Sequence, residues 1–182
     1  MKLGVLFSGG KDSTLALFKA MKENEISCLI SIFPKKDDSY MFHYPNIHLT
    51  KLQAKAMDIP IIAKDTEGKK EEELKDLEEA VSNAIKMFEI EGVVTGAVRS
   101  NYQYQRIEMI CKKLGLKLIS PLWQKNEEEI LNEILKNRFE VIITGIAAYP
   151  LTKDFLGKKL TQSLISELKE LNKKYGVSLV GE

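Results

Sequence analysis

A glycine-bearing turn near the start of the sequence constrains the fold more than any other stretch. Lys2–Phe7 is an apolar run typical of a buried strand, Ser8–Ser13 reads Ser-Gly-Gly-Lys-Asp-Ser, and Thr14–Phe18 has the character of a helix. Two adjacent glycines let backbone amides approach an oxyanion, and a helix N-terminus adds partial positive charge. The order strand, tight loop, helix therefore predicts a phosphate site in an α/β protein.

Two common phosphate loops are excluded at this corner. The nucleotide loop Gly-x-x-x-x-Gly-Lys-Ser/Thr would need glycine where Val5 stands and a hydroxyl where Asp12 stands. The dinucleotide fingerprint Gly-x-Gly-x-x-Gly is also missing after the strand. An ordinary strand–turn–helix corner is the alternative without a ligand.

The loop instead resembles the pyrophosphate loop of the ATP pyrophosphatases, Ser-Gly-Gly-x-Asp-Ser. Those enzymes cut ATP between its α and β phosphates and adenylate a substrate. The resemblance implies that the loop binds ATP through Ser8, Gly9, Gly10, Lys11, Asp12 and Ser13, with Lys11, Asp12 and Ser13 at the chemistry. Asp12 suits a Mg²⁺ ion that bridges the phosphates, and helix capping by Asp12 is an equal alternative.

Composition bounds the class of protein. The 182 residues favour one domain over 1–182, and a net charge of +1 gives no general attraction to nucleic acid or membrane. No apolar run approaches the ~20 residues of a membrane span. The two cysteines and two histidines form no Cys-x-x-Cys or zinc-type spacing, which favours a cytoplasmic protein without a structural metal.

The order of apolar patterns predicts an α/β fold with a doubly wound, mainly parallel sheet and helices on both faces. Continuous apolar runs without alternation indicate strands that are buried on both faces. Further strands are expected at 26–33, 59–63, 92–97, 117–120, 139–146 and 177–180. Helices are expected between them, at about 14–23, 46–57, 70–90, 100–114, 126–135 and 161–176. Asn46 is expected to cap the second helix, which has Ile47, Leu49, Leu52 and Ala56 as its candidate apolar positions.

Three segments that follow strands carry candidate ligand-binding side chains, because such segments line the crevice of a doubly wound sheet. Gly96 and Ala97 end a strand where a nucleoside could approach the backbone. Aromatic and polar groups gather in three regions, 40–43, 100–108 and 121–123, and could form a substrate wall. The candidates are Tyr40, His43, Ser100, Tyr102, Gln103, Arg106, Glu108 and Trp123. A hydrophobic plug, a capped surface helix and a core tryptophan are the respective alternatives.

The whole chain resembles the archaeal form of the diphthine–ammonia ligase (diphthamide synthase) family. The resemblance rests on Ser8–Ser13, Tyr40-Met41-Phe42-His43, Gly96-Ala97, Ser100 with Tyr102-Gln103, Arg106-Ile107-Glu108, Cys111, Pro121-Leu122-Trp123 and Gly181-Glu182. It implies that ATP adenylates the carboxylate of diphthine on the translation elongation factor. Ammonia, expected as free ammonium, would then displace AMP. Relatives continue past Gly-Glu, so a C-terminal extension is expected to be missing after Glu182.

Two rival functions remain open at the level of sequence. A tRNA-modifying thiolase would need paired reactive cysteines and a basic face, and neither is evident. An ATP-binding sensor without chemistry would keep the loop but form no AMP. The family resemblance implies the elongation factor and ammonium as partners, ATP and Mg²⁺ as cofactors, and neither nucleic acid nor a membrane. A homodimer is a further expectation.

Overall fold

The computed structural model describes residues 1–35, 46–67 and 70–181. Contacts divide the chain into two compact units, Met1–Trp123 and Gln124–Glu182. Length alone predicts one domain, and each unit is considered below by itself.

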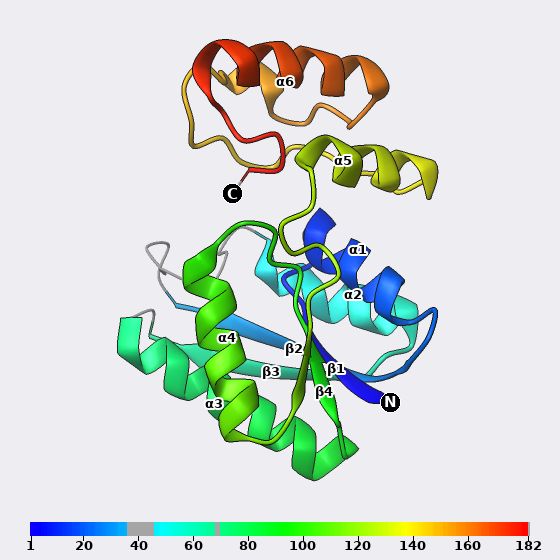
Figure 1. Ribbon diagram of the computed structural model, residues 1–182, viewed down its shortest axis with the longest axis vertical. Coiled ribbons are helices and arrows are strands. Elements are labelled where there is room, and N and C mark those ends of the chain that lie inside the picture. Colours follow the sequence, from blue (N-terminus) through cyan, green and yellow to red (C-terminus); the bar gives the residue numbers. More distant parts are fainter. Residues whose placement is uncertain (36–45, 68–69, 182) are drawn as a thin grey trace. The chain divides into compact units, whose positions relative to one another are not determined.

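A five-stranded parallel sheet forms the centre of the first unit (Figure 1). Its strands lie in the order β3-β2-β1-β4-β5, and all four neighbouring pairs are parallel. Their bounds are Lys2–Leu6 for β1, Glu25–Pro34 for β2, Ile61–Thr66 for β3, Gly92–Val94 for β4 and Lys117–Ile119 for β5. The strand order confirms the doubly wound parallel sheet predicted from the sequence.

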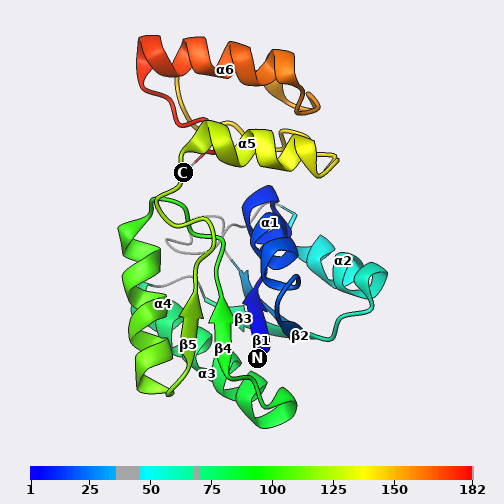
Figure 2. The ribbon, with the colours of Figure 1, turned by 45° about the vertical axis from the view of Figure 1, so that its right-hand side comes forward.

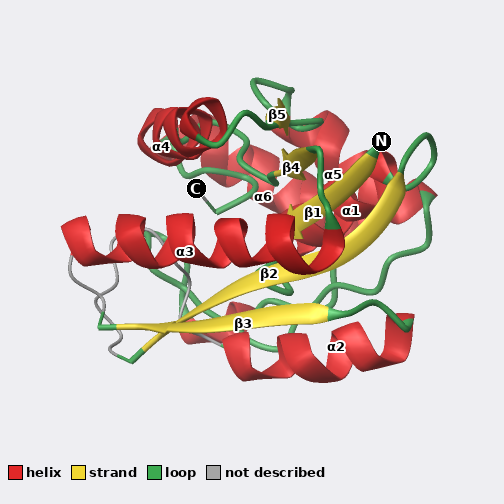
Figure 3. Ribbon diagram, turned by 90° about the horizontal axis from the view of Figure 1, so that it is seen from below, coloured by secondary structure: helices red, strands yellow, loops and turns green. Residues whose placement is uncertain are grey.

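Helices cover both faces of this sheet. Figures 2 and 3 show α1 and α2 on one face and α3 and α4 on the other. Their bounds are Lys11–Ala20 for α1, Thr50–Met57 for α2, Lys70–Phe88 for α3 and Asn101–Lys113 for α4, and a short 3-10 helix, Ile47–Leu49, precedes α2. Both faces of the sheet are therefore excluded from water, which explains why its strands read as continuous apolar runs.

The chain changes direction across the sheet between β1 and β4. The connection through α1 leads from β1 to β2 and β3, whereas α3 returns the chain to β4 on the other side of β1. Leu3, Gly4 and Val5 pair with Gly92, Val93 and Val94, so the carboxyl ends of the two strands lie side by side. Ligands of doubly wound sheets bind at this switch point.

The second unit contains two helices and irregular segments. These are α5, Glu127–Lys136, α6, Gln162–Tyr175, and a 3-10 helix, Lys153–Phe155. Its buried side chains include Ile130, Ile134 and Ile165. An ion pair of 2.6 Å between Lys169 Nζ and Glu128 Oε1 joins the two long helices. Side-chain caps at Asn126 and Thr161 confirm the predicted starts of α5 and α6.

The strands expected at 139–146 and 177–180 are wrong. In the described part of the second unit, the first region has only an isolated antiparallel bridge between Ile142 and Lys159. In the second region, the Glu127 carboxylate accepts hydrogen bonds from Leu179 N and Ser178 Oγ. Side chains and turns thus satisfy backbone groups that the apolar pattern assigned to a sheet.

Of the four apolar positions expected for the second helix, only Ile47 is buried. Leu52 is 65% exposed and Leu49 is 39% exposed, whereas Thr50 and Ala54 are buried. Asn46 makes no capping hydrogen bond and has a left-handed backbone, φ 62°. The helix therefore turns a small and polar surface inward, which apolar periodicity does not detect.

Candidate functional site

The Ser8–Ser13 loop lies directly after β1, at the switch point of the sheet. Gly96, which follows β4, lies against the start of α1. A Cβ atom at this position would meet Ser13 N at 2.8 Å and the Asp12 carbonyl carbon at 2.9 Å. The segment after β4 therefore touches the backbone at the start of α1, which agrees with the proximity predicted for Gly96 and the Ser8–Ser13 loop. A glycine at position 96 is needed for that contact, whatever ligand binds there.

Hydrogen bonds among serine and glycine groups close the loop. Gly9 has φ +76°, a conformation that glycine adopts at low cost. The hydroxyl groups of Ser8 and Ser13 are 3.2 Å apart, and Ser13 Oγ donates to Gly10 O at 3.1 Å. Gly10 N donates weakly to Ser8 Oγ at 3.5 Å. The loop is thus a short, internally bonded turn with small side chains around it.

The N-cap residue of α1 is a glycine and so forms no side-chain capping hydrogen bond. Gly10 is the N-cap residue, and its carbonyl accepts from Thr14 N at 3.0 Å and from Thr14 Oγ1 at 2.8 Å. Asp12 stands inside the first turn, so the alternative in which Asp12 caps the helix is wrong. The amide groups of a first helical turn have no partners within the helix, and they attract anions.

Lys11 and Asp12 form an ion pair of 2.7 Å beside this helix terminus. The side chains are only 17% and 22% exposed, so the pair is partly shielded from water. Shielding strengthens its Coulomb attraction relative to that of a surface pair. The arrangement offers one ammonium group and one carboxylate next to a set of backbone amides, which suits a polyphosphate.

A second set of candidate side chains lies on α4. Ser100 is its N-cap residue, and Ser100 Oγ accepts from Gln103 N at 3.3 Å. This bond confirms the capped start of the helix, and the capping explains part of the polarity that the sequence shows at 100–106. Any ligand role of Ser100 or Gln103 comes in addition to this structural one.

Two aromatic pairs extend from α4. The Arg106 guanidinium carbon lies 3.4 Å from the centre of the Tyr102 ring, and Arg106 Nη1 donates to Tyr102 O at 3.4 Å. Tyr104 and Trp123 stack with ring centres 4.2 Å apart and an interplanar angle of 18°. Stacking on Tyr104 gives Trp123 a packing partner, and the tyrosine is a candidate that sequence reasoning missed.

The other candidates are not all brought together. Glu108 Oε2 pairs with Lys112 Nζ at 2.9 Å along α4, and positions two apart on a helix, such as Arg106 and Glu108, do not face each other. Tyr40 and His43 lie outside the described residues. The described residues therefore group Tyr102 with Arg106, and Tyr104 with Trp123.

Side chains from two further elements support the loop. Gln53 Nε2 on α2 donates to Gly9 O at 3.1 Å, and Ser31 Oγ on β2 donates to Phe7 O at 2.5 Å. Neither residue was among the candidates. A polar residue at an inward-facing position is the sequence feature that could have identified them. Ser31 interrupts an apolar strand, and Gln53 lies on the buried side of α2 next to Ala54.

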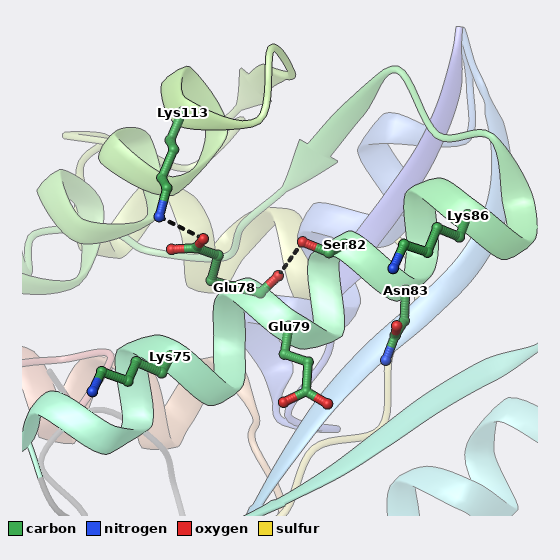
Figure 4. Close-up of a pocket in the computed structure, with 7 residues that line it drawn as sticks. All are labelled: Lys75, Glu78, Glu79, Ser82, Asn83, Lys86 and Lys113. Carbon is green, nitrogen blue, oxygen red and sulfur yellow. Dashed lines mark hydrogen bonds and ion pairs between the residues drawn. The ribbon is translucent and has the colours of Figure 1, made fainter.

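A hollow of about 290 Å³ lies elsewhere, on the outer side of α3 (Figure 4). Its lining consists of charged and amide or hydroxyl side chains, namely Lys75, Glu78, Glu79, Ser82, Asn83, Lys86 and Lys113. Lys113 Nζ pairs with Glu78 Oε1 at 2.6 Å across it. Lys113 ends α4 and so stands near the amino ends of the strands, opposite the loop edge. We interpret the hollow as solvated helix surface.

The described residues hold no cluster of metal-ligating side chains, and both cysteines are buried. No group of three or more potential metal-ligating side chains is found in residues 1–35, 46–67 and 70–181. Burial raises the pKa of the Cys28 thiol to about 12. Burial also raises the pKa of Cys111 to about 11, with a smaller contribution from the Glu108 carboxylate. Both thiols are therefore protonated at neutral pH and poor nucleophiles. No described helix combines the length and the apolar character that a membrane crossing requires.

Comparisons with known proteins identify the family of the chain. Residues 1–118 match the family described as diphthamide synthase N-terminal domain, and residues 126–182 match the diphthamide synthase C-terminal domain. The chain is 36% identical to the diphthine–ammonia ligase of Rattus norvegicus and 33% identical to that of Homo sapiens. Both alignments cover 100% of this chain and 75% of the relative. The Schizosaccharomyces pombe protein of the same name is 33% identical, with 33% of its length covered.

A solved structure shares the fold. It is described as the predicted subunit of tRNA methyltransferase from Methanocaldococcus jannaschii, with a TM-score of 0.51 and 19% identity. The match covers 98% of this chain and 90% of the other, and at this identity it bears on the fold alone. Because matches to both domain families together span nearly the entire sequence, the chain belongs to the diphthamide synthase family.

Proposed function

We propose that this protein is a diphthine–ammonia ligase, which converts diphthine on the translation elongation factor to diphthamide with ATP and ammonium. The observation that carries the proposal is the Ser8–Ser13 loop in front of α1, at the switch point of a chain that belongs to the diphthamide synthase family. The name of the relatives supplies the substrate and the nitrogen donor.

The proposed reaction has two steps. A diphthine carboxylate oxygen attacks the α-phosphorus of ATP, and the bond from that phosphorus to the bridging oxygen breaks, so pyrophosphate leaves with the electron pair. Ammonia then attacks the acyl carbon of the adenylate, AMP leaves with the electron pair of the acyl–oxygen bond, and nitrogen loses a proton. The products are the amide, AMP and pyrophosphate.

The loop residues suit the first step electrostatically. The carboxylate and the phosphates repel each other, so their charge must be neutralised where they meet. The amides of Gly9 and Gly10, the start of α1 and the Lys11 ammonium would do this, and the leaving pyrophosphate would stay in the loop. The Ser8 and Ser13 hydroxyl groups, 3.2 Å apart, would add donors to its oxygens. Gly96 and Ala97 would border the nucleoside.

Asp12 is the residue that would hold Mg²⁺. A single carboxylate fits this ion, because Mg²⁺ at phosphate sites takes one or two carboxylates and fills its remaining positions with phosphate oxygens and water. The Lys11 ammonium, 2.7 Å from Asp12, would have to shift toward the phosphates when the ion binds. The ion would supply charge neutralisation on the pyrophosphate.

The α4 groups suit the modified side chain. Diphthine carries a quaternary trimethylammonium group, and aromatic faces bind such cations. Tyr102, Trp123 and Tyr40 would provide these faces, Arg106 would meet the carboxylate or α-phosphate, and His43 would form hydrogen bonds. Ser100 and Gln103 would line the same wall, whereas Glu108, which pairs with Lys112 and does not face Arg106, would add attraction to the cation from outside it. The proposal also includes a cytoplasmic location, a homodimer and independence from nucleic acid.

The test is an amidation assay. The protein is incubated with ATP, Mg²⁺, ammonium and a diphthine-bearing elongation factor, and AMP and the mass of the factor are followed. The expected result is one AMP per amide formed, with a loss of about 1 Da for each hydroxyl replaced by an amino group. Omitting the elongation factor is the control that detects uncoupled ATP cleavage.

The rivals give different outcomes in the same assay. A sensor would bind ATP and form no AMP under any condition. A thiolase would form AMP with tRNA and a sulfur donor, although the raised pKa values of both cysteines speak against a thiolate intermediate. AMP formation that depends on tRNA and ignores the elongation factor would contradict the proposed function.

A further inference from the structure

The side chain of Gln53 lies against Gly9, in the middle of the pyrophosphate loop. Its Nε2 atom donates to Gly9 O at 3.1 Å, and a Cβ atom on Gly9 would lie only 2.3 Å from Gln53 Oε1. Thr50, one turn earlier on α2, contributes its methyl group at 3.1 Å from the same point. The absence of a side chain at Gly9 therefore makes room for the Gln53 amide.

The hydrogen bond determines the direction of a peptide group. A carbonyl oxygen only accepts, so the nitrogen of the Gln53 amide must be the atom that faces Gly9 O. In a trans peptide the C=O and N–H bonds point in opposite directions. Fixing Gly9 O toward α2 therefore turns Gly10 N–H away from α2, to the side where it meets Ser8 Oγ at 3.5 Å.

Neighbouring carbonyl groups of the loop are held in other ways. Phe7 O accepts from Ser31 Oγ, and Gly10 O accepts from Ser13 and Thr14 in the first turn of α1. The peptide between Gly9 and Gly10 is flanked by two glycines, so its rotation is the least hindered by side chains. A rotated peptide would present a carbonyl oxygen, rather than an amide, to an anion.

We propose that Gln53 is a positioning residue of the ATP site, which keeps the carbonyl of the Gly9–Gly10 peptide away from the pyrophosphate and its amide toward it. The inference rests on the proposed function, because it takes the anion of the loop to be the pyrophosphate of ATP. It assigns to α2 a role in anion binding that is separate from the charges of Lys11 and Asp12.

The experiment removes the donor and keeps the shape. Gln53→Met has a similar length without a donor, and Gln53→Glu has the same outline without a donor when ionised. The control is Lys55→Met, on the exposed side of α2. Binding of inorganic pyrophosphate and of AMP is measured by calorimetry for each protein, with its melting temperature and, for the assay, KM for ATP and kcat.

The expected result separates positioning from packing. Gln53→Met should bind pyrophosphate on the order of tenfold more weakly, the effect of one displaced amide contact to an anion. Its AMP affinity should match that of Lys55→Met within error, and its melting temperature should fall by no more than the few degrees that one lost hydrogen bond costs. Gln53→Glu should bind pyrophosphate still more weakly. In ¹⁵N-labelled protein without ligand, the Gly10 amide resonance should shift in Gln53→Met and stay in place in Lys55→Met.

Three outcomes decide the matter. Pyrophosphate affinity in Gln53→Met equal to that of the unmodified protein would overturn the positioning role. Equal losses for pyrophosphate and AMP, together with a lower melting temperature, would overturn it as well, because they indicate general loosening of α2. An unmodified protein that binds neither ATP nor pyrophosphate would overturn the proposed function instead. In that case the shift of the Gly10 resonance would still show whether the Gln53 hydrogen bond orients the Gly9–Gly10 peptide.

Discussion

At the scale of single residues, Lys11 and Asp12 are the charged pair from which most of the chemistry should follow. Lys11→Ala should lower the rate of AMP formation by about 10²–10³-fold, because it removes a preorganised donor to the developing phosphate charge. Asp12→Ala should have a similar effect through the loss of Mg²⁺. The measurement is steady-state AMP release with the elongation factor at saturation.

Lys22→Ala is the matched control for this pair. Lys22 lies just beyond the other end of α1 and is exposed, so its removal should change the rate by less than twofold. Near-normal turnover in Lys11→Ala would take the lysine out of the mechanism, provided that circular dichroism shows a folded protein.

Gly96 allows a second test at this scale. Gly96→Ala would place a methyl group 2.8–2.9 Å from backbone atoms of Asp12 and Ser13, where no flexible side chain can move aside. The start of α1 must then shift, and such overpacking costs about 1–3 kcal/mol. Urea unfolding should show a loss in that range, accompanied by weaker ATP binding. Gly145→Ala, which has open space around it, should change neither quantity.

At the scale of elements, the start of α4 separates a structural role from a ligand role. Ser100→Ala removes the acceptor for Gln103 N and should cost about 1 kcal/mol, or roughly 2–4 °C in melting temperature. Asn126→Ala removes the corresponding cap of α5 and serves as the comparison. If Ser100 also touches the substrate, only Ser100→Ala should raise KM for the elongation factor. Equal KM values in both variants would show that Ser100 acts only as the N-cap of α4.

Most helices and strands could be predicted from the sequence, because burial on both faces and side-chain caps leave local sequence patterns. The predictions failed where contacts with distant residues determine the structure. Strands β1, β2 and β4 are buried on both faces and read as unbroken apolar runs. Helices α5 and α6 begin at the predicted side-chain caps. The orientation of α2 was not predictable, because Gln53 and Thr50 face inward for contacts with a distant loop. Residues 139–146 have the composition of a strand and lack a partner sheet.

The site was predictable to a smaller extent. The Ser8–Ser13 motif carries its own geometry, since local sequence defines both the turn and the helix start. The contact of Gly96 with Asp12 and Ser13 follows from strand order, which the positions of the apolar runs indicate. Ser31 and Gln53 donate hydrogen bonds to carbonyl groups of the loop, and they lie on elements 20–45 residues away along the chain. Such contacts depend on packing angles that no local pattern encodes.

At the scale of the whole molecule, the two buried thiols predict an alkaline loss of stability. Cys28 and Cys111 have folded pKa values of about 12 and about 11, above the usual thiol value. More than about one pH unit below the unfolded pKa, both states keep the thiols protonated, so the thiols add no pH dependence. As the pH rises past the unfolded pKa, only the unfolded chain ionises, and the free energy of unfolding falls. One pH unit above that value, the loss is about 1.4 kcal/mol for each thiol.

Urea unfolding at pH 7 and pH 10 measures this loss. A Cys28→Ala/Cys111→Ala protein is the control, because lysine and tyrosine side chains titrate equally in both proteins. The decrease between the two pH values should be larger in the unmodified chain. The same decrease in both proteins would show that the thiols reach water in the folded state.

The central position of β1 has a consequence for the order of events during synthesis. Strand β1, which is synthesised before both of its partners, forms pairs on both sides, with β2 and with β4, and the second partner ends at Val94. Until that segment emerges, one edge of β1 remains open, and Gly96 has not yet reached the start of α1. Contacts so distant along the chain slow folding. Nucleotide binding should therefore appear late on a nascent chain, and arrested chains that end before residue 94 should not bind ATP.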